Sequence, residues 1–558
     1  MTAQFPSHTP FRDEEVAPLA AEGALFDTLT LTGWHRVTSD PYATSWALLA
    51  ALHSGEPSAQ PLRAGCRRYL LRSQQLDGSW GQTVQERFLM TPNAYVALSL
   101  DYERGTEDIP ATEFAELRRA VLAARTYQRK METLIYPRLP GELMRCFRPL
   151  CVVAATAGRE RLVERLLPLL PPPELAELPA SDQMCFQLVG LCDTLPRMWQ
   201  AAQQEEVATL CARQLQNGSW WCVTDFTAMA LLALTAHAET EQVRERGWEY
   251  LRAAQNEDGG LPQFFDCEVF LTAYVCYVYA ALVASHHMPV PERLLALTPW
   301  LRARQQPSGL WSFTPAFPGG DLDDTAWLVL WLRETNGADL HDAAIARAVT
   351  AMLARQRADG SFPSWADLGG DPDVTAHVLH ALWALDIRSP AAERALSYLL
   401  ARQREDGSWP ATWHVSPVYG TAQALHALAR GPYTDVSRHA VERGIAYLMR
   451  AVEGAADSRT FVAEEMSMAC WGLAAIWRTT WLDAALQQQA QAAVKRRLCA
   501  ASPTTSPPAL SLTAGAAHSI ADALPSEPPP LWLAQFRYTS APLRLATAAA
   551  CARALAVE

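Results

Sequence analysis

Lysine is almost absent from this chain of 558 residues, where Lys130 and Lys495 are the only lysines among 47 basic residues. The remaining cations are arginines, which favour bidentate contacts with carboxylate or phosphate groups. Acidic residues outnumber basic ones, and the formal net charge is −12 at pH 7. An acidic chain is repelled by nucleic-acid phosphates, so the charge argues against DNA or RNA as a partner.

Other absences narrow the class of protein. The 12 cysteines show no CxxC or other zinc-binding spacing, which indicates small buried residues in a reducing cytosol. The polar, acidic N-terminus is unlike a signal peptide, and we find no apolar run long enough to cross a bilayer. No segment alternates with period two, so little or no sheet is expected. We therefore expect a cytoplasmic protein without a transmembrane segment, although attachment to a membrane surface stays open.

Six copies of one short pattern are present instead. Each copy has Gln, two residues, a small polar residue, Gly, one residue, and then an aromatic residue or Leu. From the second copy onward the Gln residues are roughly 40 to 50 apart, the size of a helix-pair repeat. The copies are residues 74–80, 214–220, 255–261, 305–311, 356–362 and 403–409.

The pattern has a local physical meaning. Its Gly supplies the left-handed residue that ends an amphipathic helix, and a second, nearly apolar helix follows with Thr or Asp at its start. A helix that is apolar on all sides must be buried on more than one side. Outer and inner helices that alternate in this way favour closed α/α barrels, and the chain is long enough for two or more domains.

The stretch GDLDDTAW, residues 320–327, places Asp321, Asp323 and Asp324 directly before an apolar run. One repeat later, residues 371–376 read DPDVTA, so two acids and Thr-Ala recur while Val374 stands where Asp324 stands. Helix capping accounts for part of the pattern, but it needs no third acid. Crowded, partly buried carboxylates retain a proton on one of them, so a general acid is one interpretation, and a cap or a metal site is the other.

These residues resemble the class II terpene cyclases, which include squalene–hopene cyclases and cyclases of linear prenyl diphosphates. The family motif is Asp-x-Asp-Asp, and its middle acid protonates an alkene. By that match Asp323 is the acid, supported by Asp321 and Asp324. Residues 39–50, 78–98, 413–425 and 531–544 are similar to the prenyl-diphosphate branch, whereas DVTAH with His377 is a feature of the squalene branch.

The resemblance implies a fold of two α/α barrels, called β and γ in this family, with the cavity between them. Residues 1–35 would begin the β domain, residues 36–288 would form γ, and residues 289–558 would complete β. It also implies protonation-initiated cyclisation of a linear prenyl diphosphate that keeps its diphosphate, with geranylgeranyl diphosphate the first guess and farnesyl diphosphate the second. No class I Asp-Asp-x-x-Asp motif is found in the sequence.

Further site residues are expected around the acid. His377 would hold a proton or orient an aspartate, and His414 is a candidate for the terminating base. Arg537 and Arg544 are candidates for binding the diphosphate, and Glu107 and Asp108 for binding Mg²⁺ with it. Aromatic faces would stabilise the cation, and the candidates are Trp311, Phe313, Trp327, Trp365, Trp413 and Tyr419.

Two other functions stay open. A squalene-type cyclase would bind a hydrocarbon at a membrane, through an apolar entry surface and without Mg²⁺. A helical-repeat scaffold would bind protein through an open concave surface and would expose Asp323. A zinc prenyltransferase barrel is discounted because Cys267 lacks a His partner. A homodimer, and a downstream phosphatase or class I synthase as partner, also stay open.

Overall fold

The computed structural model describes residues 39–81, 84–105, 109–134, 204–365, 369–411, 417–432, 434–454, 463–477 and 479–500, with Ala550 and Ala554. Within these ranges the regular backbone is helical, and only isolated β-bridges such as Asp40–Leu261 join neighbouring segments. The all-α prediction is confirmed.

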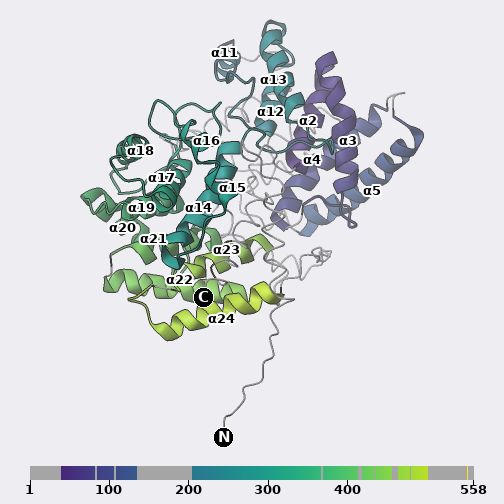
Figure 1. Ribbon diagram of the computed structural model, residues 1–558. Helices are drawn as coiled ribbons and strands as arrows, with labels where there is room; N and C mark the ends of the chain where they lie inside the picture. The colour runs from purple at the N-terminus through teal and green to yellow at the C-terminus, as the bar shows by residue number, and fades with distance from the viewer. Residues whose placement is uncertain are drawn as a thin grey trace.

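Figure 1 shows the helices in two groups, one formed by the N-terminal helices and α12–α13, the other by α14 onward. The helices are α2 (Pro41–Ser54), α3 (Gln60–Ser73), α4 (Val84–Glu103), α5 (Ala111–Leu134), α11 (Gln204–Ala212), α12 (Thr224–Leu234), α13 (Glu241–Ala254), α14 (Glu268–His286), α15 (Glu292–Leu295), α16 (Thr298–Arg302), α17 (Leu322–Asn336), α18 (Ala343–Leu353), α19 (Pro372–Ala384), α20 (Pro390–Ala401), α21 (Pro417–Arg430), α22 (Asp435–Gly454), α23 (Ala463–Ala474) and α24 (Ala484–Ala500), with 3₁₀ turns η1 (Pro57–Ala59) and η6 (Ala238–Thr240).

The second group is a ring of inner helices, in which α14, α17, α19, α21 and α23 pack each against the next. Two bonds link α23 back to α14: the Trp471 indole N–H donates to the Val278 carbonyl at 3.1 Å, and His286 Nε2 lies 2.9 Å from the Ala474 carbonyl oxygen. Inner helices such as α19 are buried on all sides, whereas outer helices such as α18 bury one face. The predicted alternation of inner and outer helices is confirmed here.

The first group has α2 at its centre, in contact with α3, α4 and α12. Its core contains the fully buried Trp46, Trp80 and Trp248. The end of the group returns to its beginning, because the Asp40 N–H donates to the Leu261 carbonyl at 2.8 Å and the Leu261 N–H donates to the Thr44 hydroxyl at 2.9 Å. The segment after Leu261 then leads into α14 of the second group.

Each copy of the Gln–Gly pattern makes the same bonds. In residues 356–362 the Gln356 amide donates to the Gly360 carbonyl at 3.1 Å and to the Ala391 carbonyl at 2.7 Å on the next outer helix. The aromatic residue closes the unit through its N–H, which in Phe362 donates to the hydroxyl of Thr375 on the inner helix at 2.9 Å. The pattern therefore joins two outer helices and one inner helix through hydrogen bonds, and it determines where each inner helix begins. We call this bonded unit the Gln–Gly clip.

Helix α14 lies before the expected domain boundary at residue 288, yet it packs against α17 and its side chains belong to the core of the second group. The boundary stays a prediction, and this packing favours placing it between Leu261 and Glu268. In the described part of the chain, α14 is also the one helix long and apolar enough to cross a membrane, contrary to our expectation that no run would be. Its apolar window is 83% buried, as in the core helix of a folded barrel.

Candidate functional site

Asp321 begins the helix that carries the acid motif. It is the N-cap of α17, and its Oδ1 accepts the Asp324 N–H at 2.9 Å. Its Oδ2 accepts the Phe313 N–H at 3.1 Å, which ties the cap to the loop after the fourth Gln–Gly pattern. Both bonds favour the ionised carboxylate. Capping therefore accounts for Asp321, and the cap turns the next acids into the interior.

Asp323 lies in the first turn of α17 and faces the neighbouring inner helix α19. It is buried, with 9% of its surface exposed, and its Oδ1 lies 2.6 Å from Nδ1 of His377. The expected reach of His377 to the acid cluster is therefore present. Its catalytic role stays a prediction.

Burial and neighbouring charges favour the neutral form of this acid. Burial raises the pKa of Asp323 well above its ordinary value, and the charge of Asp371 raises it further. Burial lowers the pKa of His377 to about 4, against an opposing effect of Asp373. A neutral carboxylic acid therefore faces a neutral imidazole at pH 7.

The tautomer of His377 can be assigned from its surroundings. Nε2 of His377 makes no hydrogen bond of good geometry to a described residue, although the side chain of Gln423 lies close enough to raise the pKa of the imidazole. An orphaned acceptor costs less than an orphaned N–H donor, so we place the imidazole proton on Nδ1. Nδ1–H then donates to Oδ1 of Asp323, which leaves the acid proton on Oδ2.

The other acids raise the cost of ionising this region. Asp324 is fully buried, and burial together with the charge of Asp321 raises its pKa well above the ordinary range. Asp321 itself has its pKa raised to about 7, mainly by burial and then by Asp323. One repeat later, Asp371 accepts bonds from the Ser364 N–H at 2.8 Å and the Ser364 hydroxyl at 2.7 Å.

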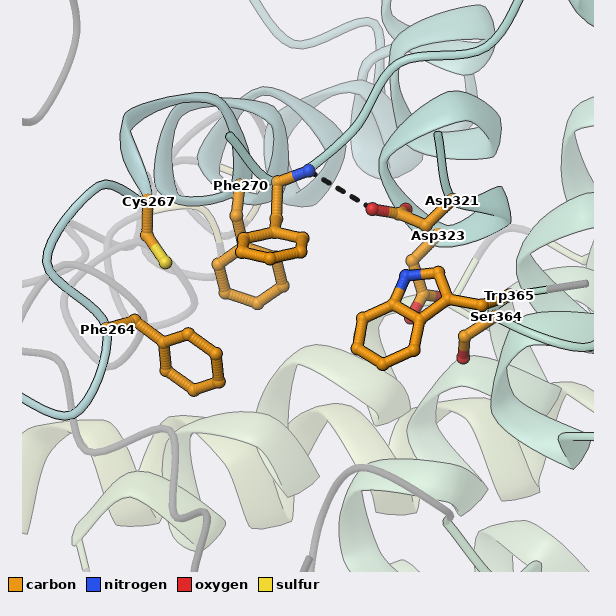
Figure 2. Close-up of a pocket in the computed structure, with 8 residues that line it drawn as sticks. Phe264, Cys267, Phe270, Asp321, Asp323, Ser364 and Trp365 are labelled. Atoms are coloured by element: carbon orange, nitrogen blue, oxygen red, sulfur yellow. Dashed lines mark hydrogen bonds between the residues drawn. The ribbon is translucent and has the colours of Figure 1, made fainter. Parts of the chain in front are cut away.

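A hollow lies beside Asp323 and holds about 420 Å³ of empty space, its open mouth included. Because this figure includes space open to solvent, it does not measure the size of a ligand. Figure 2 shows aromatic rings of different segments around this space, with the carboxyl group of Asp323 behind the ring of Trp365. The lining residues are Phe264, Cys267, Phe270, Phe313, Asp321, Asp323, Ser364 and Trp365.

The predicted aromatic residues fall into two groups. Phe313 and Trp365 line the hollow. Trp327 and Tyr419 surround His377 instead, with ring centroids 5.2 Å and 6.4 Å from the imidazole. Trp311 is fully buried and its indole N–H donates to the Leu301 carbonyl at 2.7 Å, which favours a packing role over contact with a ligand.

The remaining predicted residues lie outside the described part of the chain. They are His414, Trp413, Arg537, Arg544, Glu107 and Asp108. Among the described residues no group of three or more His, Cys, Asp or Glu side chains is suited to hold a metal ion. The zinc interpretation of Cys267 gains nothing from its surroundings, because burial raises the pKa of this thiol well above its ordinary value.

Sequence analysis did not identify several residues of the site. Phe264 and Phe270 line the hollow and follow the third Gln–Gly pattern, as Phe313 follows the fourth, so position relative to the pattern could have identified them. Tyr277 on α14 stacks on Trp327 with ring centroids 5.6 Å apart and donates its hydroxyl to Gln423 at 2.8 Å. No sequence pattern near Tyr277 links it to the acid, because α14 and α17 are brought together only in the folded ring of inner helices.

Comparisons with known proteins agree with this geometry. Residues 367–496 match the model of the squalene-hopene cyclase C-terminal domain. A drimenyl diphosphate synthase of Streptantibioticus cattleyicolor is 32% identical over 187 residues, covering 32% of this chain and 34% of the relative. Another drimenyl diphosphate synthase, of Streptomyces showdoensis, is 29% identical over 149 residues, covering 26% of this chain and 27% of the relative. The chain thus spans about a third of the length of the curated relatives it matches.

The fold has a counterpart along the whole chain. The structure of ent-copalyl diphosphate synthase from Streptomyces platensis superposes with a TM-score of 0.64 and 22% identity, covering 98% of this chain and 99% of that one. At this identity the likeness shows the fold, which is the α/α-barrel architecture expected from the sequence. By fold and by its matching segments, the chain is similar to class II terpene cyclases and, in residues 367–496, to the squalene–hopene cyclases.

Proposed function

We propose that the chain is a class II terpene cyclase that protonates a linear prenyl diphosphate and releases a cyclic product with the diphosphate retained. One observation carries the proposal: a buried Asp323, paired with His377 at 2.6 Å, faces a hollow lined by aromatic rings. Protonation of an alkene requires a carboxylic acid that keeps its proton at neutral pH beside an apolar, aromatic surface.

The proton transfer follows from the assigned tautomer. The proton on Oδ2 of Asp323 passes to a terminal alkene carbon, so the O–H bond breaks and a C–H bond forms. The carboxylate left behind accepts the hydrogen bond from Nδ1–H of His377, which stabilises the conjugate base. Because His377 stays neutral, it does not compete for the proton.

The cation that results needs stabilisation without a nucleophile. The rings of Phe264, Phe270, Phe313 and Trp365 line the hollow. Each cation–π contact contributes about 0.5–2 kcal/mol, toward the upper value where water is excluded. The π-electrons of the next alkene then attack the cation and close the rings, and a proton is lost at the end.

The names of the relatives bear on the chain length of the substrate. The matching relatives carry the name drimenyl diphosphate synthase, and drimenyl is the bicyclic isomer of farnesyl, as copalyl is of geranylgeranyl. These names favour farnesyl diphosphate over geranylgeranyl diphosphate, which sequence analysis placed first.

The diphosphate and Mg²⁺ sites stay predictions. The candidates Arg537, Arg544, Glu107 and Asp108 lie outside the described residues. The described part of the chain offers no group of three or more His, Cys, Asp or Glu side chains suited to hold a metal ion. We therefore derive no step through Mg²⁺. His414 as terminating base, a cytoplasmic location, a homodimer and a downstream enzyme likewise stay predictions.

A squalene-type cyclase is the second candidate. The squalene-hopene cyclase C-terminal domain matches residues 367–496, and Nδ1 of His377 lies 2.6 Å from Oδ1 of Asp323. The scaffold interpretation required an exposed Asp323, and the residue is buried. The test is incubation of the purified chain with farnesyl diphosphate, geranylgeranyl diphosphate and squalene, followed by phosphatase treatment and mass spectrometry. Cyclic alcohols from a diphosphate are expected. Cyclic products from squalene alone would favour the second candidate, and acyclic alcohols alone would remove the first.

A further inference from the structure

The backbone of the first helix group is strained next to the hollow. Trp221 and Cys222 are consecutive non-glycine residues with φ of 58° and 59°. The left-handed conformation is unfavourable for an L-residue, and it is unusual for a bulky side chain. Strain of this kind persists only where surrounding contacts impose it.

Bonds within the first group hold Cys222 in this conformation. The Cys222 N–H donates to the Ser219 hydroxyl at 3.1 Å, and its carbonyl accepts the Tyr250 hydroxyl at 2.8 Å. The Val223 N–H donates to the Trp220 carbonyl at 3.1 Å across the turn. The turn is therefore fixed at both ends, and the indole of Trp221 leaves it in a defined direction.

That direction leads to the second group. The Trp221 ring lies 5.3 Å from that of Trp365, edge to face, and 5.8 Å from that of Phe317. Phe317 lies 5.2 Å from Trp365, so the three rings contact one another. Trp365 lines the hollow together with Asp323, whereas Trp221 and Phe317 do not. Two rings that do not line the hollow therefore pack against a residue that does.

We propose that Trp221 is a positioning residue that holds Trp365 against the hollow and so limits the length of the prenyl chain that can fold there. The inference rests on the proposed function and deepens it, since it names the feature that selects farnesyl over geranylgeranyl chains. A role in stability alone does not account for Trp221. Its ring is only partly buried, and the strained turn that holds it is itself unfavourable.

Removal of the Trp221 ring changes the packing of Trp365. Without the Trp221 indole, Trp365 loses one of the rings that pack against it and can turn away from Asp323. The hollow then gains room beside Asp323, where the terminal alkene must lie. Because one methylene in an apolar pocket discriminates about 10- to 200-fold, an added isoprene unit should respond strongly to this room.

The test compares Trp221→Gly with Trp221→Phe in the full chain. Glycine adopts the left-handed conformation freely, so Trp221→Gly removes the ring and relieves strain together. We expect kcat/KM for geranylgeranyl diphosphate relative to farnesyl diphosphate to rise about tenfold in Trp221→Gly, and to stay within about twofold of wild type in Trp221→Phe. Cys222→Gly is the matched control, because it relieves strain at the next residue without touching the rings.

The outcomes separate this inference from the proposed function. An unchanged ratio in a folded, active Trp221→Gly variant overturns the inference and leaves the cyclase intact. A change of equal size in Cys222→Gly also overturns it, since backbone relief would then be the cause. If Trp221→Gly does not fold, Phe317→Ala removes the second supporting ring and must raise the ratio. A wild-type chain that cyclises neither diphosphate overturns both proposals.

Discussion

The carboxyl group of Asp323 determines the proposed chemistry at the scale of single residues. The sequence pattern identified the acid motif and His377 as its partner, because the second copy of the repeat places the imidazole one inner helix away. The identity of the wall residues could be predicted only in part. Phe313 and Trp365 lie where the pattern places them, whereas Tyr277 depends on how α14 joins the ring.

Replacement of Asp323 should separate activity from stability. Asp323→Asn removes the acid proton and should lower kcat by at least about 10²–10⁴-fold, the usual contribution of a general acid. It also removes a buried group whose raised pKa makes the folded state unfavourable at neutral pH, so the free energy of unfolding should increase. Turnover and urea unfolding of the same preparation measure both effects.

Asp225 offers a matched control for this change. It lies two residues before Thr227, as Asp323 lies two residues before Thr325, and it is fully buried with a pKa raised to about 8 by burial. Asp225→Asn should stabilise the chain while kcat stays within about twofold of wild type. Retained turnover in Asp323→Asn would show that the acid has been assigned to the wrong residue.

At the scale of elements, the Gln–Gly clip is what the sequence predicted best. Gly360 has φ of +90°, and a Cβ there would lie 2.5 Å from the Arg394 carbonyl oxygen on the next outer helix. The pattern therefore requires glycine for two reasons, backbone conformation and close approach. The sequence could not show which helices the clip joins, because the glutamine bonds reach a helix some 35 residues later in this copy.

Two glycine substitutions should separate these reasons. Gly337, at the end of α17, has φ of +62°, and a Cβ added there would meet no atom within 4 Å. Gly337→Ala should cost roughly 1–2 kcal/mol of unfolding free energy from conformation alone. Gly360→Ala should cost roughly 1–3 kcal/mol more because of the clash. Equal losses in thermal or urea unfolding would contradict the close packing of the clip.

At the scale of the whole molecule, two sets of buried groups change stability in opposite directions as pH rises. The pKa of Asp225 is raised to about 8 by burial, so the folded state keeps a proton that the unfolded chain releases near pH 4. Burial lowers the pKa of His377 to about 4 and that of His426 to about 3, so the unfolded chain keeps protons that the folded state has lost. The contribution of Asp225 to stability is therefore lost as pH rises from about 4 to about 8, and that of the histidines is lost as pH falls from about 6.5 to about 3.

The free energy of unfolding should accordingly decrease from about pH 6.5 to pH 8, where only the buried acids differ in protonation between the two states, and from about pH 4 to pH 3, where only the histidines do. Between these ranges the two sets oppose each other. Urea titrations from pH 3 to pH 8 measure the profile. Asp225→Asn should reduce the decrease on the alkaline side and leave the decrease below pH 4 unchanged. A profile that rises from pH 6 to pH 8 in the wild type would contradict the buried, neutral state of these acids.

The arrangement of the two helix groups was predictable as a class and not in detail. Repeat spacing indicated α/α barrels, and the structure shows inner and outer helices as expected. The sequence did not show to which helix group α14 belongs, because its apolar residues suit the core of either group. Its bonds to α23 and its packing on α17 favour the second.

The most direct test of the acid is cyclisation in D₂O. Asp323 exchanges its proton with solvent between turnovers, so the wild-type chain given farnesyl diphosphate should deliver one deuterium to carbon. After phosphatase treatment, mass spectrometry should show a cyclic alcohol one mass unit heavier than its product from H₂O. A cyclic product without carbon-bound deuterium, or release of diphosphate during the reaction, would contradict protonation by Asp323.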